Sequence, residues 1–239
     1  MTERTPVVRP PEPLVSIVVP TLEEARTLPG LLDHLAGLAG RLEIVIADGG
    51  SLDATARLAR EHPSVSRVVE APGGRARQLN AGAAVSSGEM LVFVHADSRL
   101  PPDAYRWLAA ACRDGRLVGG NFRLRFEGGD LFARVLSAYY RLSRRLGVYY
   151  GDSSLFVRRE VFELLGGFRE LPIMDDYDFV RRLERSGTTA CLPGPALTSA
   201  RRWRRTGVTR TVCSWTAIQA LYWAGVPPTC LAPLYRRIR

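Results

Sequence analysis

The loops of this chain hold six aspartates whose carboxylates could act together: Asp48, Asp53, Asp97, Asp152, Asp175 and Asp176. A carboxylate at the carboxyl edge of a parallel sheet can hold a divalent cation against a diphosphate, and its hard oxygen ligands select Mg²⁺ or Mn²⁺. Another carboxylate can take a proton from a hydroxyl group. Because an isolated aspartate after a strand is more often a helix cap than a catalyst, the elements that carry these residues decide between the two roles.

Short apolar runs rich in β-branched residues alternate with amphipathic segments in the first half of the chain. They predict strands near residues 14–19, 42–47, 65–70 and 90–94, and helices near residues 23–40, 54–62, 73–85 and 101–112. Ser51 or Asp53 is the expected N-cap of the second helix. The alternation predicts a parallel, doubly wound α/β sheet, whose ligands bind beyond the carboxyl ends of the strands. Asp48 and Asp97 follow two such ends.

The pattern changes beyond residue 117. It predicts strands near residues 118–126 and 153–157, and helices near residues 131–146, 160–165 and 176–186. The stretch 211–228 is uncharged, but its Thr, Ser, Gln and Pro residues make it a poor transmembrane span. We expect an amphipathic helix there that ends near Gly225.

All 33 basic side chains are arginines, and the chain contains no lysine. A Schiff base, a pyridoxal aldimine, a phosphate-binding P-loop and a kinase nucleotide site each need the amine of lysine, so these mechanisms are excluded. Residues 1–120 hold 13 arginines and 14 acids, whereas residues 121–239 hold 20 arginines and 10 acids. The net charge of +9 therefore lies in the second half, and no acid follows Glu184.

The length of 239 residues fits one large α/β domain with its own core. The four cysteines lie far apart in the sequence, so we expect neither a metal clip nor a disulfide framework. No secretory signal is visible, and a cytoplasmic location is therefore expected. The proline-rich residues 1–13 are expected to form a disordered lead-in.

Seven short segments carry a family resemblance: residues 18–24, 47–53, 74–82, 93–97, 166–168, 175–176 and 202–203. In this order they resemble the inverting family 2 glycosyltransferases of the GT-A fold, and the likeness spans roughly residues 14–205. Each segment alone is weak, but seven in the right order are strong. The His-Ala-Asp of residues 95–97 and the Gly-Arg-Ala-Arg-Gln of residues 74–78 look most like a small group linked to arsenosugar biosynthesis.

The resemblance implies a single GT-A domain with a mixed, mostly parallel central sheet. Residues 14–117 would form its nucleotide-sugar-binding half and residues 118–205 its acceptor half. Residues 206–239 would follow as a basic, aromatic, helical extension.

The resemblance also implies which residues bind the donor. Thr21 and Glu24 would line the base and ribose, and Asp48 would accept a hydrogen bond from the edge of the base. Arg75 and Arg77 would lie near the diphosphate, because guanidinium forks match phosphate oxygens. The alternative for both arginines is a solvated helix start.

Asp97 would be the metal-bridging acid of the family's Asp-x-Asp motif. His95 stands where the first aspartate usually stands, which is a departure from the family pattern. A neutral imidazole can still ligate Mn²⁺ or bond a ribose, but it brings no negative charge. The cofactor is therefore expected to be Mn²⁺ or Mg²⁺, with Asp97 and His95 as candidate ligands. The alternative is a histidine that only packs against the sheet edge.

Asp176 would be the general base, at the second position of the family's Glu-Asp motif, where Asp175 replaces the glutamate. Its like-charge neighbours favour a raised pKa of Asp176, whereas Arg181 and Arg182 oppose this. The same acids also fit a helix N-cap and dipole compensation, and both roles can hold together. Gly151 and Asp152 are expected to shape the acceptor side.

Arg202 and Trp203 resemble the end of the Gln-x-x-Arg-Trp motif of processive relatives and could close over the diphosphate or the acceptor. Ser199 stands at the glutamine position, which argues against a polymer synthase. Residues 185–239 carry nine arginines and three of the four tryptophans. This composition suits an anionic membrane surface at the inner face of the membrane or a polyprenyl-phosphate acceptor. The alternative is a helix that packs on the domain.

The expected function is metal-dependent hexosyl transfer, with inversion, from a nucleoside-diphosphate sugar to an acceptor hydroxyl. A UDP-sugar is the expected donor, and the acceptor is a lipid-linked or a small molecule. One alternative is an α/β nucleotidyltransferase, which the missing lysine disfavours. Another is a basic protein that binds nucleic acid or a membrane surface without catalysis. Because no nucleic-acid motif accompanies the arginines, no nucleic-acid partner is expected.

Overall fold

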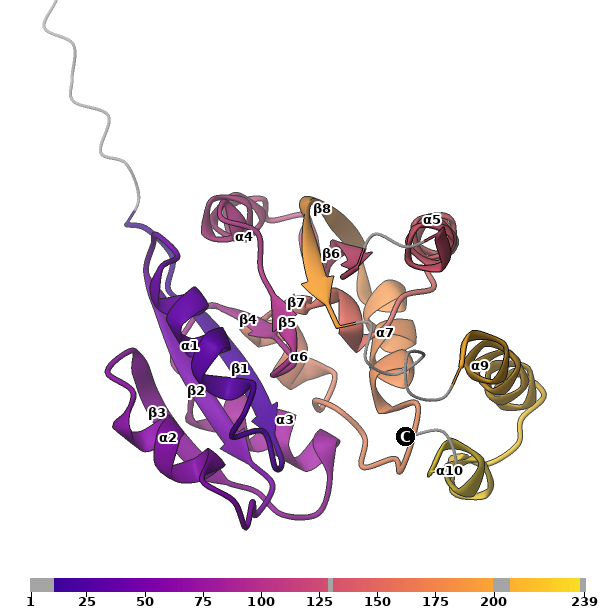
Figure 1. Ribbon diagram of the computed structural model, residues 1–239. Coiled ribbons are helices and arrows are strands. Elements are labelled where there is room, and N and C mark those ends of the chain that lie inside the picture. The colour runs from indigo at the N-terminus through magenta and orange to yellow at the C-terminus, as the bar shows by residue number, and fades with distance from the viewer. Residues whose placement is uncertain (1–10, 129–130, 200–206, 237–239) are drawn as a thin grey trace, which may run out of the picture.

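The computed structural model describes residues 11–128, 131–199 and 207–236 (Figure 1). Its strands are β1 Val15–Thr21, β2 Leu42–Asp48, β3 Val65–Glu70, β4 Met90–Phe93, β5 Ser98–Arg99, β6 Leu117–Phe126, β7 Leu155–Arg158 and β8 Thr188–Thr198. Its helices are α1 Leu28–Ala36, α2 Thr55–Glu61, α3 Arg75–Val85, α4 Ala104–Arg113, α5 Leu131–Arg145, α6 Arg159–Leu164, α7 Asp175–Ser186, α9 Val208–Trp223 and α10 Pro228–Arg236, with a 3-10 turn, η1, at Gly151–Ser153.

The strands form one sheet in the order β3-β2-β1-β4-β7-β6-β8-β5. The neighbours β3, β2, β1 and β4 run parallel, as do β6 and β8. Strand β7 is antiparallel to both β4 and β6, and β5 is antiparallel to β8. The expected mixed, mostly parallel sheet is therefore confirmed, and the purely parallel sheet that the alternation alone suggests extends only as far as β4.

Strand β8 was not expected from the sequence. Its centre contains Pro193, Gly194 and Pro195, residues that normally weaken a strand. The register of its pairing with β6 shifts at this point, where Phe122 lies opposite Leu192 but Arg123 lies opposite Pro195. The strand therefore accommodates the two prolines in an irregular stretch of its ladder.

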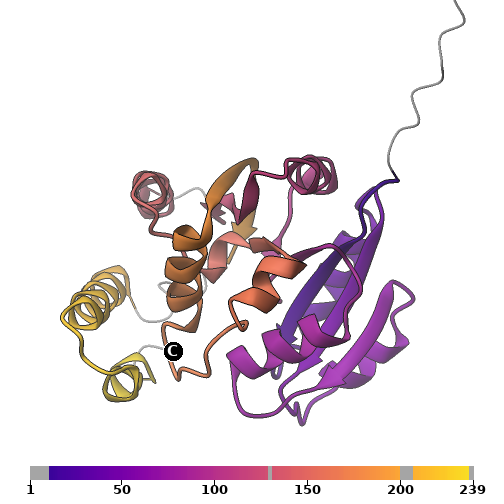
Figure 2. The ribbon, with the colours of Figure 1, turned by 180° about the vertical axis from the view of Figure 1, so that it is seen from behind.

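Helices cover both faces of the sheet, and the side chains of β1 alternate between them. Ile17 belongs to the apolar cluster with residues of α1 and α4 on one face. Val18 belongs to the cluster with residues of α3, α6 and α7 on the other. Figures 1 and 2 show the two sets of helices from opposite sides. This arrangement fixes the carboxyl ends of β1, β2 and β4 relative to the starts of α3 and α7.

The two C-terminal helices pack against the segment that leads into α7. Ile218 of α9 and Leu231 of α10 share an apolar cluster with Ile173 and Tyr177. The indole Nε1–H of Trp223 donates a hydrogen bond of 2.9 Å to the Tyr177 hydroxyl. In the ranges given above, no helix has the length and apolarity needed to cross a membrane. These contacts support the alternative in which the C-terminal helices pack on the domain.

Candidate active site

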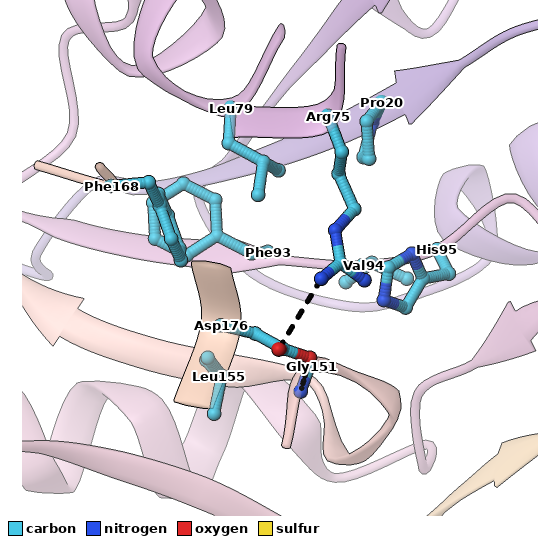
Figure 3. A pocket seen from close by; sticks show the side chains of 10 residues that line it. All are labelled: Pro20, Arg75, Leu79, Phe93, Val94, His95, Gly151, Leu155, Phe168 and Asp176. Carbon is cyan, nitrogen blue, oxygen red and sulfur yellow. Dashed lines mark hydrogen bonds and ion pairs between the residues drawn. The ribbon is translucent and has the colours of Figure 1, made fainter. Parts of the chain in front are cut away.

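The carboxylate of Asp176 is buried at the start of α7 and points into a small pocket. Its Oδ2 accepts a hydrogen bond of 2.9 Å from the N–H of Gly151 in η1. Its Oδ1 lies 3.3 Å from the guanidinium of Arg75 at the start of α3. Figure 3 shows the side chains of Arg75 and His95 on one side of the Asp176 carboxylate and the backbone of Gly151 beside it. The fold thus unites residues that lie up to 101 positions apart.

Arg75 holds the neighbouring carboxylate even more closely. Its Nε–H donates to Asp175 Oδ2 at 3.0 Å, and its terminal nitrogen donates to the other oxygen of Asp175. The side chain of Asp175 is only 4% exposed, whereas that of Arg75 is 34% exposed at the pocket. The guanidinium therefore ties α3 to α7 and compensates two buried carboxylates.

The environment of Asp176 lowers its pKa. Burial of the carboxylate raises the pKa, but the Arg75 guanidinium and two backbone N–H groups outweigh that effect. The expected raising of the pKa by neighbouring acids is wrong, because Arg75 lies against the carboxylates. Asp178, one of those acids, is bonded by Arg169 and Arg182 at 3.1 and 2.8 Å. Asp176 is therefore ionised and ready to accept a proton at neutral pH.

The helix-cap interpretation holds only in part. The N-cap of α7 is Met174, which has a positive φ of 66° and donates no side-chain cap. Asp175, Asp176 and Asp178 instead lie in the first turn, where negative charge compensates the helix dipole. Asp53 also stands beside a helix start, and its carboxylate accepts the N–H of Thr55 at 2.9 Å. Ser51 makes no cap and donates to Asp48 instead.

His95 lines the pocket, and Asp152 lies beside it. His95 Nε2 is 3.9 Å from Asp152 Oδ1, and the two side chains are 22% and 30% exposed. Asp97 is part-buried and follows His95 in the loop after β4. Within the described ranges, no three His, Cys, Asp or Glu side chains gather closely enough to hold a metal ion unaided. A cation held here would therefore need oxygen ligands from a substrate, as Mg²⁺ and Mn²⁺ sites at phosphates commonly do.

The side chains expected to bind a nucleotide form a buried network at the ends of β1 and β2. Asp48 is 1% exposed and accepts hydrogen bonds from the Thr21 hydroxyl, the Ser51 hydroxyl and the N–H groups of Gly50 and Ser51. Four donors fill the acceptor sites of its two oxygens. The predicted contact with a base edge would have to replace one of them. Glu24 is part-buried, and its carboxylate accepts the hydroxyl of Thr27.

Sequence reasoning missed the role of Gln78 in α3. Its amide donates 2.6 and 3.0 Å hydrogen bonds to the carbonyl groups of Thr21 and Ala47. The side chain is buried and therefore locks α3 against the ends of β1 and β2. Gln78 belongs to the segment 74–82, which the sequence marks as functional. The sequence of that segment does not indicate which strand ends the side chain of Gln78 contacts.

Arg77 is not among the residues that line the pocket. Arg77 pairs with Glu170 at 2.8 Å, and both side chains are more than half exposed. This pairing agrees with the alternative of a solvated helix start. Because the side chain of Arg77 is exposed, its guanidinium is also accessible to an anion. Arg202 and Trp203 lie outside the described residues.

The mixed sheet, its two helical layers and the pocket that holds Asp176 define a GT-A type α/β protein. A profile of glycosyl transferase family 2 matches residues 16–166, more than half of the chain, and the chain belongs to this family. The arsenosugar subgroup stays a prediction.

Among curated proteins, the beta-monoglucosyldiacylglycerol synthase of Nostoc sp. is 26% identical over 226 residues, which cover 85% of this chain and 47% of that protein. The PGL/p-HBAD biosynthesis glycosyltransferase of Mycobacterium bovis is 29% identical, over 77% of this chain and 72% of the relative. The chain spans about half the length of the first curated relatives it matches.

Two solved structures share the fold. A mannosyltransferase of Pyrobaculum calidifontis in complex with GDP-Man and Mn²⁺ has a TM-score of 0.67 and 23% identity, and the match covers 93% of this chain and 68% of that one. Glucosyl-3-phosphoglycerate synthase of Mycobacterium tuberculosis, in complex with Mn²⁺, UDP and glucosyl-3-phosphoglycerate, has a TM-score of 0.57 and 23% identity over 90% of this chain and 81% of that one.

Proposed function

We propose that this chain transfers a sugar from a nucleoside-diphosphate sugar to an acceptor hydroxyl with inversion at the anomeric carbon. The observation that carries the proposal is the buried, ionised Asp176 carboxylate, which faces a pocket at the carboxyl edge of the sheet. Family membership supports the same reaction class. A UDP-sugar is the proposed donor, and the fold relatives solved with UDP or GDP-Man support a donor of this kind.

The proposed donor site lies across the ends of β1 and β2 and the start of α3. Thr21, Glu24 and Asp48 would line the base and ribose. Arg75 and Arg77 would bind the diphosphate, because their forked N–H groups match its oxygens. Arg75 would then leave its carboxylate partners in part, which would make Asp176 a stronger base when the donor is bound.

The proposed reaction is a single displacement. The Asp176 carboxylate takes the proton of the acceptor hydroxyl, and the acceptor oxygen forms a bond to the anomeric carbon. The bond from that carbon to the diphosphate oxygen breaks on the opposite side, and the nucleoside diphosphate leaves with the bonding electrons. Gly151 orients the base through its N–H bond to Asp176, and Asp152 borders the acceptor side.

The residues at the pocket edge fit a divalent cation whose remaining ligands come from the donor. Asp97 and His95 are the proposed protein ligands, with Asp152 Oδ1 3.9 Å from His95 Nε2. One imidazole and one or two carboxylates suit Mn²⁺ and Mg²⁺. Bound there, the cation would stabilise negative charge on the leaving diphosphate. The fold relatives solved with Mn²⁺ support this assignment.

The acceptor is proposed to be a lipid-linked or a small-molecule hydroxyl compound. The diacylglycerol-derived product named for the Nostoc relative supports the lipid option. Arg202 and Trp203 are proposed to close over the diphosphate or acceptor, and residues 118–205 to form the acceptor half. The protein is proposed to act in the cytoplasm, in peripheral contact with the inner face of the membrane.

A donor screen by thermal denaturation tests the proposal. A nucleotide sugar present at about 100 times its Kd is expected to raise the melting temperature by roughly 5–10 °C, because it binds only the folded state. The rise should be larger with Mn²⁺ than with EDTA. The free sugar and the free nucleoside serve as controls and should have little effect. Absence of any shift across UDP-, GDP- and dTDP-sugars would overturn the proposed donor class.

Replacing Gly151 by alanine is expected to impair turnover without unfolding the protein. An added Cβ would lie 3.0 Å from His95 Nε2 and 3.1 Å from Asp176 Oδ2, so both side chains must shift by a few tenths of an ångström. Because a misplacement of about 1 Å can lower the rate by about 100-fold, this smaller shift is expected to lower kcat by a smaller factor that is still measurable. Gly115→Ala is the matched control, because a Cβ there meets no atom within 4 Å. Equal kcat values for the two variants would contradict the role of Gly151.

A further inference from the structure

Helix α5 exposes a continuous apolar face. Leu131, Val135, Tyr139 and Leu142 follow one another at intervals of three or four residues, which places them on one side of the helix, and Leu146 follows directly after its last residue, Arg145. Their exposed fractions range from 57% to 79%. We call these five residues the α5 stripe. Such a run of large exposed apolar side chains usually marks an interaction surface.

The opposite side of α5 is already used for packing. Ala133 and Leu136 are buried against Leu124 and Phe126 of β6. The stripe therefore does not serve the core of the domain, and the described residues leave it exposed.

Charge along α5 indicates the kind of partner. Its sequence contains four arginines and no acid. Arg134, Arg141 and Arg145 are exposed, and no carboxylate of the described residues pairs with them. They lie on one flank of the stripe, because their spacings of seven and four residues keep them on one side of a helix. Three unpaired guanidinium groups beside an apolar stripe repel one another unless anions lie between them.

The arginines also border an open groove between α5 and strands β6 and β8. Arg123, Arg141, Arg144 and Arg145 line this groove, whose volume is about 370 Å³. Arg144 is held in place by Asn121 at 2.6 Å and Thr189 at 2.8 Å and pairs with Glu184 at 3.4 Å, so Arg123, Arg141 and Arg145 supply the uncompensated charge. The groove is therefore a preformed cationic site, and guanidinium groups suit phosphate oxygens in particular.

We propose that α5 docks this protein on an anionic phospholipid bilayer, with the α5 stripe inserted among the acyl chains and the flanking arginines on the lipid phosphates. An apolar stripe bordered by arginines and lacking acids is complementary to such a surface in both polarity and charge. This proposal builds on the membrane contact given under the proposed function, but it does not depend on the transfer chemistry. The sequence suggested residues 206–239 as the segment that contacts the membrane, whereas we assign this contact to α5.

Helix α5 is close in sequence to a residue of the candidate active site. Residues 146–150 connect its end to η1, which carries Gly151 of the candidate active site. A bilayer bound by α5 would therefore lie near the side of the pocket that η1 borders, where a lipid-linked hydroxyl could enter.

Vesicle sedimentation tests the docking without any donor or acceptor. The full chain should sediment with vesicles of phosphatidylcholine mixed with phosphatidylglycerol, and not with phosphatidylcholine alone. Replacing Arg134, Arg141 and Arg145 together by glutamine should lower the partition coefficient by about 100-fold. The double variant Leu142→Ser, Leu146→Ser should lower it at least tenfold.

Two matched controls separate docking from general attraction to a cationic protein. The triple variant Arg57→Gln, Arg60→Gln, Arg67→Gln removes the same charge from α2 and β3, far from α5 in Figure 1, and these side chains are more than half exposed. The double variant Leu52→Ser, Leu164→Ser removes leucines that are 96% and 83% exposed. Both controls should sediment like the wild type, and circular dichroism should show that all four variants are folded.

Four results would overturn the proposal. The first is a control variant that loses binding as strongly as its α5 counterpart, and the second is a wild-type chain that ignores anionic vesicles. The third is a wild-type dimer in analytical ultracentrifugation that Leu142→Ser, Leu146→Ser turns into a monomer, because a second copy would then cover the stripe. The fourth is a melting temperature raised by glycerol 3-phosphate in a chain that binds no vesicles, because the groove would then hold a soluble phosphate.

Discussion

The Asp176→Asn protein is expected to transfer sugar about 10³-fold more slowly than the wild type, with little change in the KM of the donor. Asparagine has the same size and can still accept the Gly151 N–H bond, but it cannot take a proton from the acceptor. The loss should therefore appear in kcat. Steady-state release of the nucleoside diphosphate measures both constants.

Two further measurements make this expectation specific. The donor-induced rise in melting temperature should persist in the Asp176→Asn protein, because the donor is proposed to bind through other residues. Asp33→Asn is a suitable control, because its carboxylate is 79% exposed on α1 and distant from the pocket. Full activity of the Asp176→Asn protein would remove the assignment of the base.

Replacing Arg75 by glutamine is expected to lower the free energy of unfolding by about 3 kcal/mol at pH 7. The change leaves the carboxylates of Asp175 and Asp176, whose side chains are 4% and 12% exposed, without their shared cation. Urea denaturation measures the loss. The control Arg77→Gln removes an exposed ion pair with Glu170 and should change stability by less than about 1 kcal/mol.

The loss caused by Arg75→Gln should depend on pH. In the wild type the pKa of Asp176 is lowered in the folded state, so its contribution to stability is present above the unfolded pKa and disappears as the pH falls through the folded pKa. Without Arg75 the folded pKa moves up, and this contribution is lost. The free energies of unfolding of the two proteins should therefore differ most at pH 7 and converge as the pH falls below about 4. An equal difference in the free energy of unfolding at pH 7 and at low pH would contradict the charge compensation by Arg75.

The fold could be predicted largely because hydrophobic periodicity reports local structure. Apart from the two-residue strand β5, which was not predicted, the strands and helices as far as α4 occur where the sequence pattern predicted them, with ends that differ by a few residues. Strand β8 could not be predicted, because Pro193 and Pro195 are tolerated only where its register shifts against β6. The antiparallel direction of β7 likewise depends on pairing with strands distant in sequence, which no local pattern encodes.

The candidate site could be predicted as a set of residue types but not as a geometry. The motif order placed Asp176, His95 and Arg75 among the functional candidates, and the fold brings these three to one pocket. The pairing of Arg75 with Asp175, 100 residues apart, could not be foreseen, and it reverses the pKa shift that the sequence suggested. The four donors on Asp48 were equally hidden, because three of them depend on the turn that follows β2 and the fourth, the Thr21 hydroxyl, on the pairing of β1 with β2.

The most direct test of the central claim is release of nucleoside diphosphate from a nucleotide sugar by the purified chain. With a UDP-sugar and Mn²⁺, the wild type should release UDP at a rate that falls about 10³-fold in the Asp176→Asn protein. Release should also stop when EDTA replaces Mn²⁺. No release from any UDP-, GDP- or dTDP-sugar, or equal release by the two proteins, would contradict the assignment of this pocket as a glycosyl transfer site.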